Sequence, residues 1–252
     1  MKDYLQFALQ SIKHRKLRSW MTILAIVIGI AAIVSLVSIS QGLENAISEQ
    51  FENLGSNKLY IMPKGSGLTF SFEADKLTED DMDTLEGMAE ADFVNGYLYG
   101  KLEVLFNKDD KYTGVIGLES DASPTEVYEG QGLTLSSGRW PNKNENGVVA
   151  LGSSLAADAF DKEVFVNNKV EIEGEKFEVV GIANPVGNSE DDNNAYVSME
   201  DARVLHGEDI GISFIELVVQ EDLNMPEVAE KVERTLERAR DDENFEIFIP
   251  EQ

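Results

Sequence analysis

The 252-residue chain has no cysteine, only two histidines, and far fewer basic than acidic residues, 21 against 47. Without cysteine, no disulfide can stabilise the fold, and no thiolate can bind a metal or attack a substrate. No Gly-Lys-Ser or Gly-Lys-Thr phosphate loop occurs, so we expect no ATP site in the chain itself. The net charge of −26 argues against nucleic acid as a partner, because its phosphates would be repelled.

Charge is also missing from residues 19–43, and Trp20–Ser40 within this run is almost wholly apolar. A helix rises about 1.5 Å per residue, so this stretch would span about 30 Å, the hydrocarbon thickness of a bilayer. We therefore predict a membrane helix anchored by residues such as Trp20, Ile28 and Ile39. A cleaved signal peptide would have a shorter apolar core and a cleavage site, and a pilin-type leader would place a short basic leader against the run.

The two flanks of the apolar run carry opposite charge. Five basic residues and one acidic residue precede it, and the other 16 basic and 46 acidic residues follow it. Basic flanks stay in the cytoplasm, so the N-terminus is predicted to be cytoplasmic and the acidic part extracytoplasmic. The residues that set this topology are Lys13, Arg15, Lys16 and Arg18. The acidic surplus indicates a well-solvated exterior or, alternatively, adaptation to a salty medium.

Two helical patterns border the membrane segment. Residues 1–18 carry apolar side chains at helical spacing and should form an amphipathic helix on membrane lipid, the alternative being an unstructured basic tail. After the span, an apolar stripe ends before Gly55, a natural helix stop, so residues 19–56 are predicted to form the membrane helix and a stalk of about three turns. The stripe consists of Leu43, Ile47, Phe51 and Leu54. It would pack on its own domain or on a partner helix.

Beyond the stalk, alternating and helical patterns follow one another. Strands are predicted at 58–63, 97–106, 111–118, 148–151, 170–172, 177–182, 196–198, 212–220 and 245–249. Helices are predicted at 78–90 with a Thr78/Asp81 capping box, from Ser153 or Ser154 to Phe160, at 199–206, and along the stripe Val228–Ala239 after a cap pair at Asn224 and Glu227. Residues 64–76 and 184–194 are predicted loops, although Leu68, Phe70 and Phe72 could form a hairpin.

Strand–helix–strand thus occurs at both ends of the exported part, and two such units commonly pair into a ferredoxin-like sandwich. The predicted fold class is α+β, with one N-terminal transmembrane helix and stalk before an extracytoplasmic domain. In that domain, residues 57–119 and 210–252 form the ferredoxin-like subdomain, and residues 120–209 are an inserted mixed α/β subdomain.

No constellation of residues points to enzyme chemistry, and we predict no catalytic residue, cofactor or metal. His14 lies in the basic flank, and His206 ends a predicted helix, where a positive charge would suit the dipole. Arg139 beside Trp140 favours a structural contact over a ligand contact. Two acidic clusters lack the spacing and glycine of a calcium loop. They are Glu79, Asp80, Asp81 and Asp83, and Glu190, Asp191 and Asp192.

Several segments together carry a resemblance to a known family. The run LRSWMTILAIVIGIAAIVSL is followed by SQGLENAISEQFENLGSNKLYIMPKG, in which Leu54–Asn57 before a strand is the most specific part. Four short motifs then occur in order: VIGL at 115–118, SGRW at 137–140, VVALG at 148–152 and VVGI at 179–182. In these features the chain resembles the MacB/FtsX-type ABC transporter permeases over essentially its whole length.

The resemblance implies a mechanical rather than a chemical function. A separate cytoplasmic ABC ATPase would hydrolyse ATP, and two permease subunits, as a homodimer, would pass the motion through their stalks to the outer domains. These domains would act on a lipid, lipoprotein, peptide or drug, or on an extracytoplasmic adaptor or hydrolase. Such permeases have three further spans after the outer domain, so we expect the remainder beyond Gln252 in a longer gene product or in a separate chain.

A second function stands beside transport. A single-span anchored binding or scaffold domain, acting without an ATPase, would equally lack catalytic residues. An extracytoplasmic enzyme is a third alternative, for which the sequence offers little.

Overall fold

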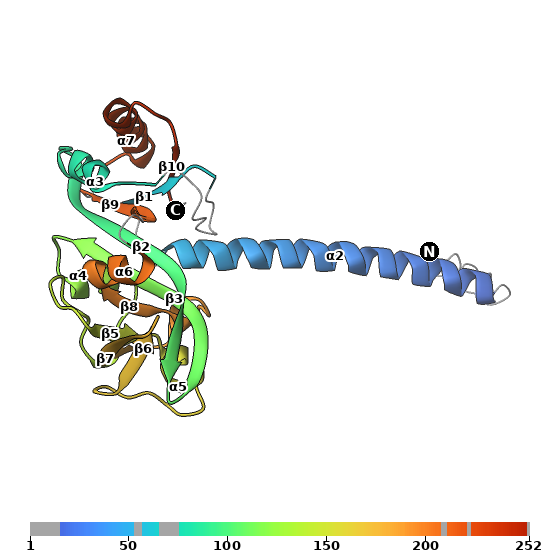
Figure 1. Cartoon of the computed structure of the whole chain (residues 1–252). Coiled ribbons are helices and arrows are strands. Elements are labelled where there is room, and N and C mark those ends of the chain that lie inside the picture. Colours follow the sequence, from blue (N-terminus) through green and yellow to red (C-terminus); the bar gives the residue numbers. More distant parts are fainter. Residues whose placement is uncertain (1–15, 53–56, 66–75, 208–210, 221–222, 251–252) are drawn as a thin grey trace. The chain divides into compact units, whose positions relative to one another are not determined.

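The computed structural model describes residues 16–52, 57–65, 76–207, 211–220 and 223–250 (Figure 1). At both ends of the first range, in 16–19 and 40–52, the description covers the backbone. The chain divides into two compact units, Met1–Gln50 and Phe51–Gln252, and each is described by itself. The predicted amphipathic helix of the N-terminal flank and the alternating apolar residues after position 65 lie outside the described residues.

Helix α2, Lys16–Glu52, contains every described residue of the first unit and ends at the second residue of the second unit. Its segment Trp20–Ile39 is 20 residues long, and its side chains are exposed. A helix that is apolar on every side has no solvated face, which is typical of a membrane span. By length and composition this helix can cross a membrane, as predicted. The helical backbone continues through the predicted stalk as far as Glu52.

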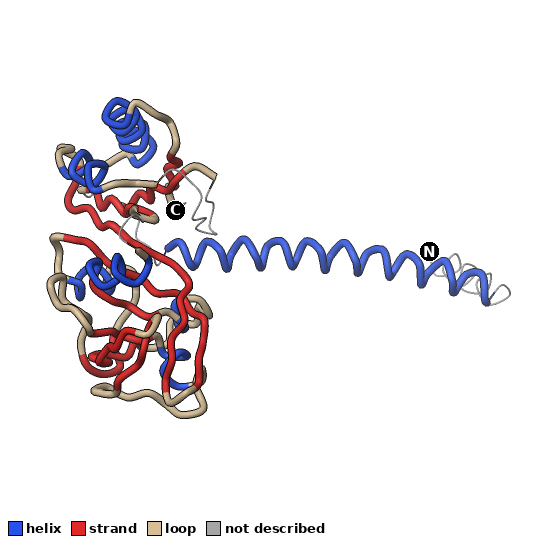
Figure 2. Tube along the Cα trace, viewed as in Figure 1, coloured by secondary structure: helices blue, strands red, loops and turns tan. Residues whose placement is uncertain are grey.

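In the described part of the second unit, ten strands form one hydrogen-bonded sheet. Figure 2 draws these strands in red. Four of the strands pair antiparallel in the order β10–β1–β9–β2. These strands are β1 Lys58–Pro63, β2 Ala91–Phe106, β9 Phe214–Val219 and β10 Phe245–Phe248. Helix α3, Glu79–Glu86, joins β1 to β2, and helix α7, Met225–Arg240, joins β9 to β10. We call these four strands and two helices the four-stranded lobe.

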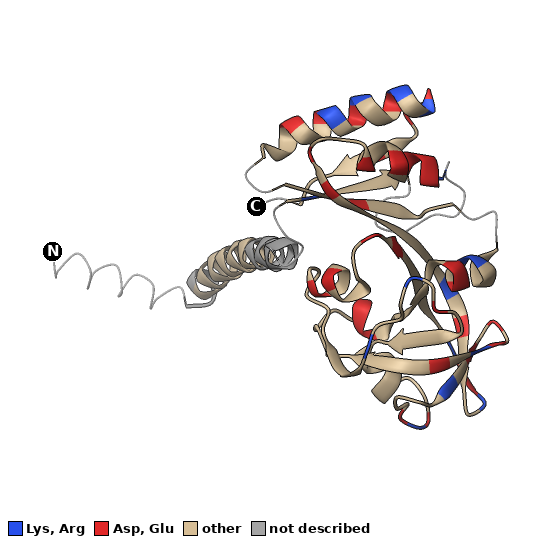
Figure 3. Cartoon of the chain, turned by 90° about the vertical axis from the view of Figure 1, so that its left-hand side faces the viewer, with Lys and Arg blue, Asp and Glu red and all other residues tan. Residues whose placement is uncertain are grey.

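Both helices of the four-stranded lobe follow from local sequence signals. The predicted capping box is present, since the Thr78 hydroxyl accepts from the Asp81 amide and the Asp81 carboxylate accepts from the Thr78 amide. The stripe of α7 is buried at Val228, Val232 and Leu236, in one cluster with side chains of α3 and of the strands. Ala239, the last residue of the predicted stripe, is exposed. The outward face of α7 alternates acidic and basic residues (Figure 3). Apolar burial on one face therefore holds both helices on the sheet.

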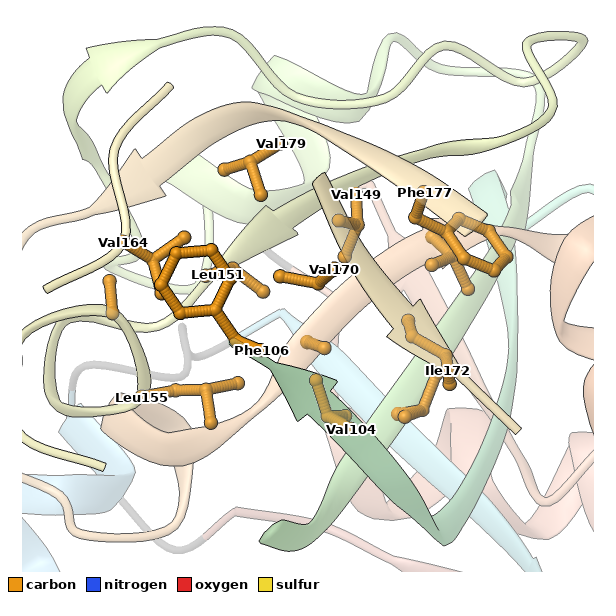
Figure 4. Close-up of a cluster of buried hydrophobic side chains, with 14 of the residues drawn as sticks. Val104, Phe106, Val149, Leu151, Leu155, Val164, Val170, Ile172, Phe177 and Val179 are labelled. Atoms are coloured by element: carbon orange, nitrogen blue, oxygen red, sulfur yellow. The ribbon is translucent and has the colours of Figure 1, made fainter. Parts of the chain in front are cut away.

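Six strands close into a barrel: β2 pairs with β3, then β8, β5, β7 and β6 follow, and β6 returns to β2. Their bounds are β3 Asp109–Ser120, β5 Val148–Leu151, β6 Lys169–Ile172, β7 Glu175–Ala183 and β8 Ala195–Ser198. The interior is filled by branched and aromatic side chains, among them Val104, Phe106, Leu151, Val170 and Phe177 (Figure 4). This barrel is a packed core and not a channel.

Short elements surround the barrel, and we call these elements and the barrel strands together the barrel lobe. The short elements are α4 Pro124–Glu129, β4 Leu135–Gly138, α5 Ser153–Ala157, the 3₁₀ turn η2 Asp191–Asn193, and α6 Met199–His206. Helix α4 packs on the outside of the barrel, where Tyr128 meets Trp140 and Tyr196 at ring centroid distances of 4.3 and 5.3 Å. Strand β2 belongs to both lobes, because its first part pairs with β9 and its last part with β6.

The structure corrects several predicted boundaries. Helix α3 ends at Glu86 and not near 90, because β2 begins at Ala91 and not at 97. Helix α5 ends at Ala157 rather than 160, and its cap position is Gly152, without a side-chain cap from serine. Helix α4, strand β4 and turn η2 were not predicted; each has at most six residues, too short for a periodic pattern. Strand β3 begins at Asp109 and not at 111, and helix α6 agrees with prediction.

The glycines of two motifs are explained by backbone contact between β4 and β7. A Cβ atom at Gly181 would lie 2.2 Å from the Arg139 carbonyl oxygen. One at Gly138, where φ is +79°, would lie 2.0 Å from the Val180 carbonyl oxygen. No side chain fits at either position, so SGRW and VVGI occur as a matched pair.

The first prediction tests this close approach. Gly181→Ala should lower the free energy of unfolding by about 1–3 kcal/mol, because the methyl group forces β4 away from β7. Thermal unfolding followed by circular dichroism of the detergent-solubilised chain measures the loss. Gly87→Ala is the matched control, because its Cβ would meet no atom closer than 3.5 Å. Equal stability of the two variants would contradict the explanation.

Candidate functional site

The two acidic clusters are used in structural contacts. Asp81 caps α3 and also binds Arg240, with 2.5 Å between Oδ2 and Nη1. Asp192 accepts from the amides of Val186 and Gly187 at 2.9 and 3.2 Å. Among the residues that the structure describes, no group of three or more His, Cys, Asp or Glu side chains is placed to hold a metal ion. These carboxylates therefore shape loops and helix ends.

His206 is placed for packing. It is the last residue of α6, and its Nε2 atom is buried without a hydrogen-bond partner. Burial lowers the pKa of the imidazole, while a backbone hydrogen bond to Val115 and the charge of Glu173 act in the opposite direction. The side chain is therefore held neutral near pH 7, rather than serving as the positive charge that the helix end would favour.

Arg139 and Trp140 point to different surroundings. The Arg139 guanidinium forms two hydrogen bonds to the Glu145 carboxylate, at 2.5 and 2.6 Å. Trp140 is buried against Tyr128 and Tyr196. Both side chains make structural contacts, as the sequence favoured.

The structure describes the side chains of only some of the predicted membrane and stalk residues. Trp20, Ile28 and Ile39 lie on α2 and are 70%, 59% and 68% exposed. Of the topology-setting and stalk residues, five lie on the helical backbone of α2 without a described side chain: Lys16, Arg18, Leu43, Ile47 and Phe51. Lys13, Arg15 and Leu54 lie outside the described residues. The roles of all eight stay predictions.

A buried carboxylate lies between the two lobes and accepts hydrogen bonds from residues of both. Glu216 on β9 is 0% exposed. Its Oε1 atom lies 2.9 Å from Lys58 Nζ and accepts from the Tyr60 hydroxyl at 3.1 Å. Its Oε2 atom accepts from Asn95 Nδ2 at 2.7 Å, from the Tyr97 hydroxyl at 3.1 Å and from Gln131 Nε2 at 3.2 Å. We call these six residues the Glu216 cluster.

The cluster joins three strands of the four-stranded lobe to the segment after α4. Lys58 and Tyr60 belong to β1, and Gln131 follows α4 on the barrel. Lys58 Nζ also donates to the Gly130 carbonyl at 3.0 Å. Burial and the charge of Glu216 raise the pKa values of Tyr60 and Tyr97, so both phenols stay protonated and donate. A buried charge that is paired and fully hydrogen-bonded fixes the geometry of its partners.

The sequence did not reveal this cluster. Glu216 is the one acid in the strand FIELVV, and Lys58 begins the strand KLYIMP. In a strand that alternates apolar and polar residues, the charged residues are expected on the face exposed to solvent. The available signal was the pair of opposite charges on two strands that the fold class would place side by side.

The second prediction concerns the ion pair of the cluster. Lys58→Met should destabilise the chain by about 3–5 kcal/mol, because Glu216 would be left buried without its cation. Adding Glu216→Gln should restore part of the loss, since the uncompensated charge is gone. Lys143→Met is the control: this lysine pairs with Glu119 and Asp121 but is 43% exposed, and its loss should cost less than about 1 kcal/mol. Chemical denaturation gives the three values, and similar losses for both lysines would contradict the prediction.

The third prediction concerns pH and His206. Its folded pKa lies below the ordinary value of 6.5, so the unfolded chain binds a proton more readily. The resulting stability is present above pH 6.5 and declines as the pH falls from there toward the folded pKa. In His206→Gln, the melting temperature should therefore fall less between pH 7.5 and pH 5.5 than in the parent chain. Equal falls in both chains would show that this histidine is not held neutral.

Comparison with known proteins identifies the family. Residues 19–235 match the family described as the MacB-like periplasmic core domain. An uncharacterised ABC transporter permease of Methanocaldococcus jannaschii, MJ1507, is 31% identical over 251 residues, which are 99% of this chain and 62% of that protein. The macrolide export ATP-binding/permease protein MacB of Vibrio parahaemolyticus is 29% identical over 167 residues, 66% of this chain and 24% of that protein.

The fold is shared with a solved structure. The periplasmic region of MacB from Actinobacillus actinomycetemcomitans superposes with a TM-score of 0.66 at 18% identity, over 81% of this chain and 94% of that one.

The chain spans about two thirds or less of the length of the curated relatives named above. One apolar helix and a periplasmic-type domain make it a membrane protein with an extracytoplasmic domain. The chain belongs to the MacB-like periplasmic core domain family, and its relatives are ABC transporter permeases.

Proposed function

We propose that this chain is the N-terminal permease part of an ABC-type transporter or mechanotransmission complex. In this proposal it couples ATP hydrolysis by a separate cytoplasmic ATPase to movement of its extracytoplasmic domain. The cargo class is a lipid, lipoprotein, peptide or drug. The observation that carries the proposal is the continuous helix α2, which runs from the basic flank through the apolar span and 13 residues beyond Ile39.

The strand pairing supports an outer domain placed between membrane segments. Strands β1 and β10 are antiparallel neighbours, with Tyr60 opposite Phe248 and Pro63 opposite Phe245. The chain therefore enters the four-stranded lobe at Lys58 and leaves it near Pro250 at the same end of the sheet. A domain with both ends at one place can be held on a membrane without its chain crossing its own surface.

The same pairing supports the predicted domain division. The order β10–β1–β9–β2, with α3 and α7 as connections, is the arrangement expected of a ferredoxin-like subdomain. We assign 57–119 and 210–252 to that subdomain and 120–209 to the insertion, with β2 and β3 extending into the barrel.

The membrane orientation and the partners belong to the same proposal. The basic flank would keep the N-terminus in the cytoplasm, near anionic lipid, and the acidic domain would face outward. A second permease subunit would lie beside the stalk as a homodimer, and an extracytoplasmic adaptor would meet the outer domain. The alternative, a single-span binding or scaffold domain, needs neither an ATPase nor a second subunit.

The fourth prediction separates transport from the alternative. The chain has no cysteine, so Ile47→Cys places a single thiol on the predicted stalk. In native membranes, mild oxidation should give a disulfide-linked permease dimer, because two stalks would lie side by side. Non-reducing gel electrophoresis and immunodetection measure the product. Glu233→Cys, on the exposed face of α7, is the control and should cross-link much less.

Equal cross-linking at both positions, or none at Ile47→Cys or Phe51→Cys, would contradict the paired stalks. The anchored scaffold would then be the better description. A neighbouring ATPase gene, or an ATPase that copurifies with the chain, would support transport.

A further inference from the structure

The Glu216 cluster stands where three strands of one lobe meet a segment of the other. Lys58, Asn95 and Glu216 come from β1, β2 and β9. Gly130 and Gln131 follow α4, whose Tyr128 packs on Trp140 and Tyr196 of the barrel lobe. Gln131 Nε2 lies 2.5 Å from the Tyr97 hydroxyl oxygen as well as 3.2 Å from Glu216. The cluster therefore bridges the two lobes through polar contacts.

The arrangement is that of a joint and not of a ligand site. Both oxygens of Glu216 are occupied by donors of the chain, two on Oε1 and three on Oε2. The Asn95 side chain is completed by Ser120, whose hydroxyl lies 2.5 Å from Asn95 Oδ1. A buried carboxylate with this many donors has no free capacity for a ligand, while each of its hydrogen bonds depends on direction.

Elsewhere the lobes are connected by strand β2, by apolar packing, and by a partly exposed ion pair between Glu79 of α3 and Arg203 of α6, whose side chains are 64% and 35% exposed. Strand β2 runs through both lobes, and Tyr97 lies in one apolar cluster with Tyr128 and Trp140 of the barrel lobe. A two-stranded ribbon twists readily, and apolar contact is non-directional. These connections keep the lobes together, but an exposed ion pair is weak and apolar contact is non-directional, so they define the angle between the lobes less sharply than the buried cluster does.

Lys58 has a special place in this joint. It is the first residue of β1, six residues after the end of α2 at Glu52. Its ammonium group binds Glu216 of its own lobe and the Gly130 carbonyl beside the barrel. The first strand that the structure describes after α2 is thereby tied to both lobes at one atom.

We propose that the Glu216 cluster fixes the orientation of the barrel lobe relative to the four-stranded lobe, with Lys58 as the positioning residue. If the stalk moves, its displacement would reach the barrel through Lys58. This consequence rests on the proposed function. The orientation itself is a property of the domain and needs no ATPase.

The fifth prediction measures the angle between the lobes. The cysteine-free chain accepts two spin labels, on Glu233→Cys of α7 and on Lys169→Cys of β6, both at exposed positions. Double electron–electron resonance on the full chain in detergent should give a narrow distance distribution. Lys58→Met should broaden or shift it, and Gln131→Ala, which leaves the ion pair intact, should do so to a smaller degree.

Two controls separate orientation from folding. Labels on Asp83→Cys and Glu233→Cys report within the four-stranded lobe and should keep their distance in every variant. Lys143→Met removes a surface ion pair and should leave the lobe-to-lobe distribution unchanged. Where Lys58→Met does not fold, Gln131→Ala alone tests the joint.

An unchanged lobe-to-lobe distribution in Lys58→Met and Gln131→Ala would overturn the proposal. Equal broadening of the within-lobe pair would also overturn it, because the cluster would then support folding without defining an angle. Failure of stalk cross-linking at Ile47→Cys, with a distribution that still responds to Lys58→Met, would remove the transport consequence and leave the joint standing.

Discussion

The register of β2 is the constraint on which both lobes depend. This strand pairs with β9 near its start, with β6 near its end and with β3 from Asn95 to Phe106. Side chains alternate along a strand, so Val94 enters one core while Val104 and Phe106 enter the other from the same face. A slip of one residue would turn all of them outward together. The two cores are therefore specified jointly.

Two kinds of contact meet on the opposite face of β2. Tyr97 contributes its ring to an apolar cluster and its hydroxyl to the carboxylate of Glu216. Apolar burial supplies much of the free energy of association and tolerates small displacements, whereas a charge buried among five donors tolerates very few. In Tyr97, the ring thus helps to hold the lobes together, and the hydroxyl helps to fix their orientation. Lys58 takes part in the Glu216 cluster and is also the first residue of the strand that follows α2.

Local signals made most of the longer helices, several strands and the membrane segment predictable. The α7 stripe, the Thr78/Asp81 box and the uncharged run each lie within a short window, and the structure contains each of them. Barrel closure was not predictable in this way, because β6–β2 and β3–β8 join residues far apart in sequence. The burial of Glu216 depends on the segment after α4, which showed no pattern of its own. The roles of the stalk residues remain predictions.

The antiparallel pairing of β1 and β10 affects how easily such a domain can be inserted into a loop of another protein. Adjacent strands lie about 4.8 Å apart, so the two chain ends of the four-stranded lobe are separated by little more than one strand spacing. Inserting the domain into a short loop therefore demands hardly any change in the distance between the loop's own ends. The barrel attached to this lobe can therefore vary in size or sequence while the distance between the two chain ends of the lobe stays constant.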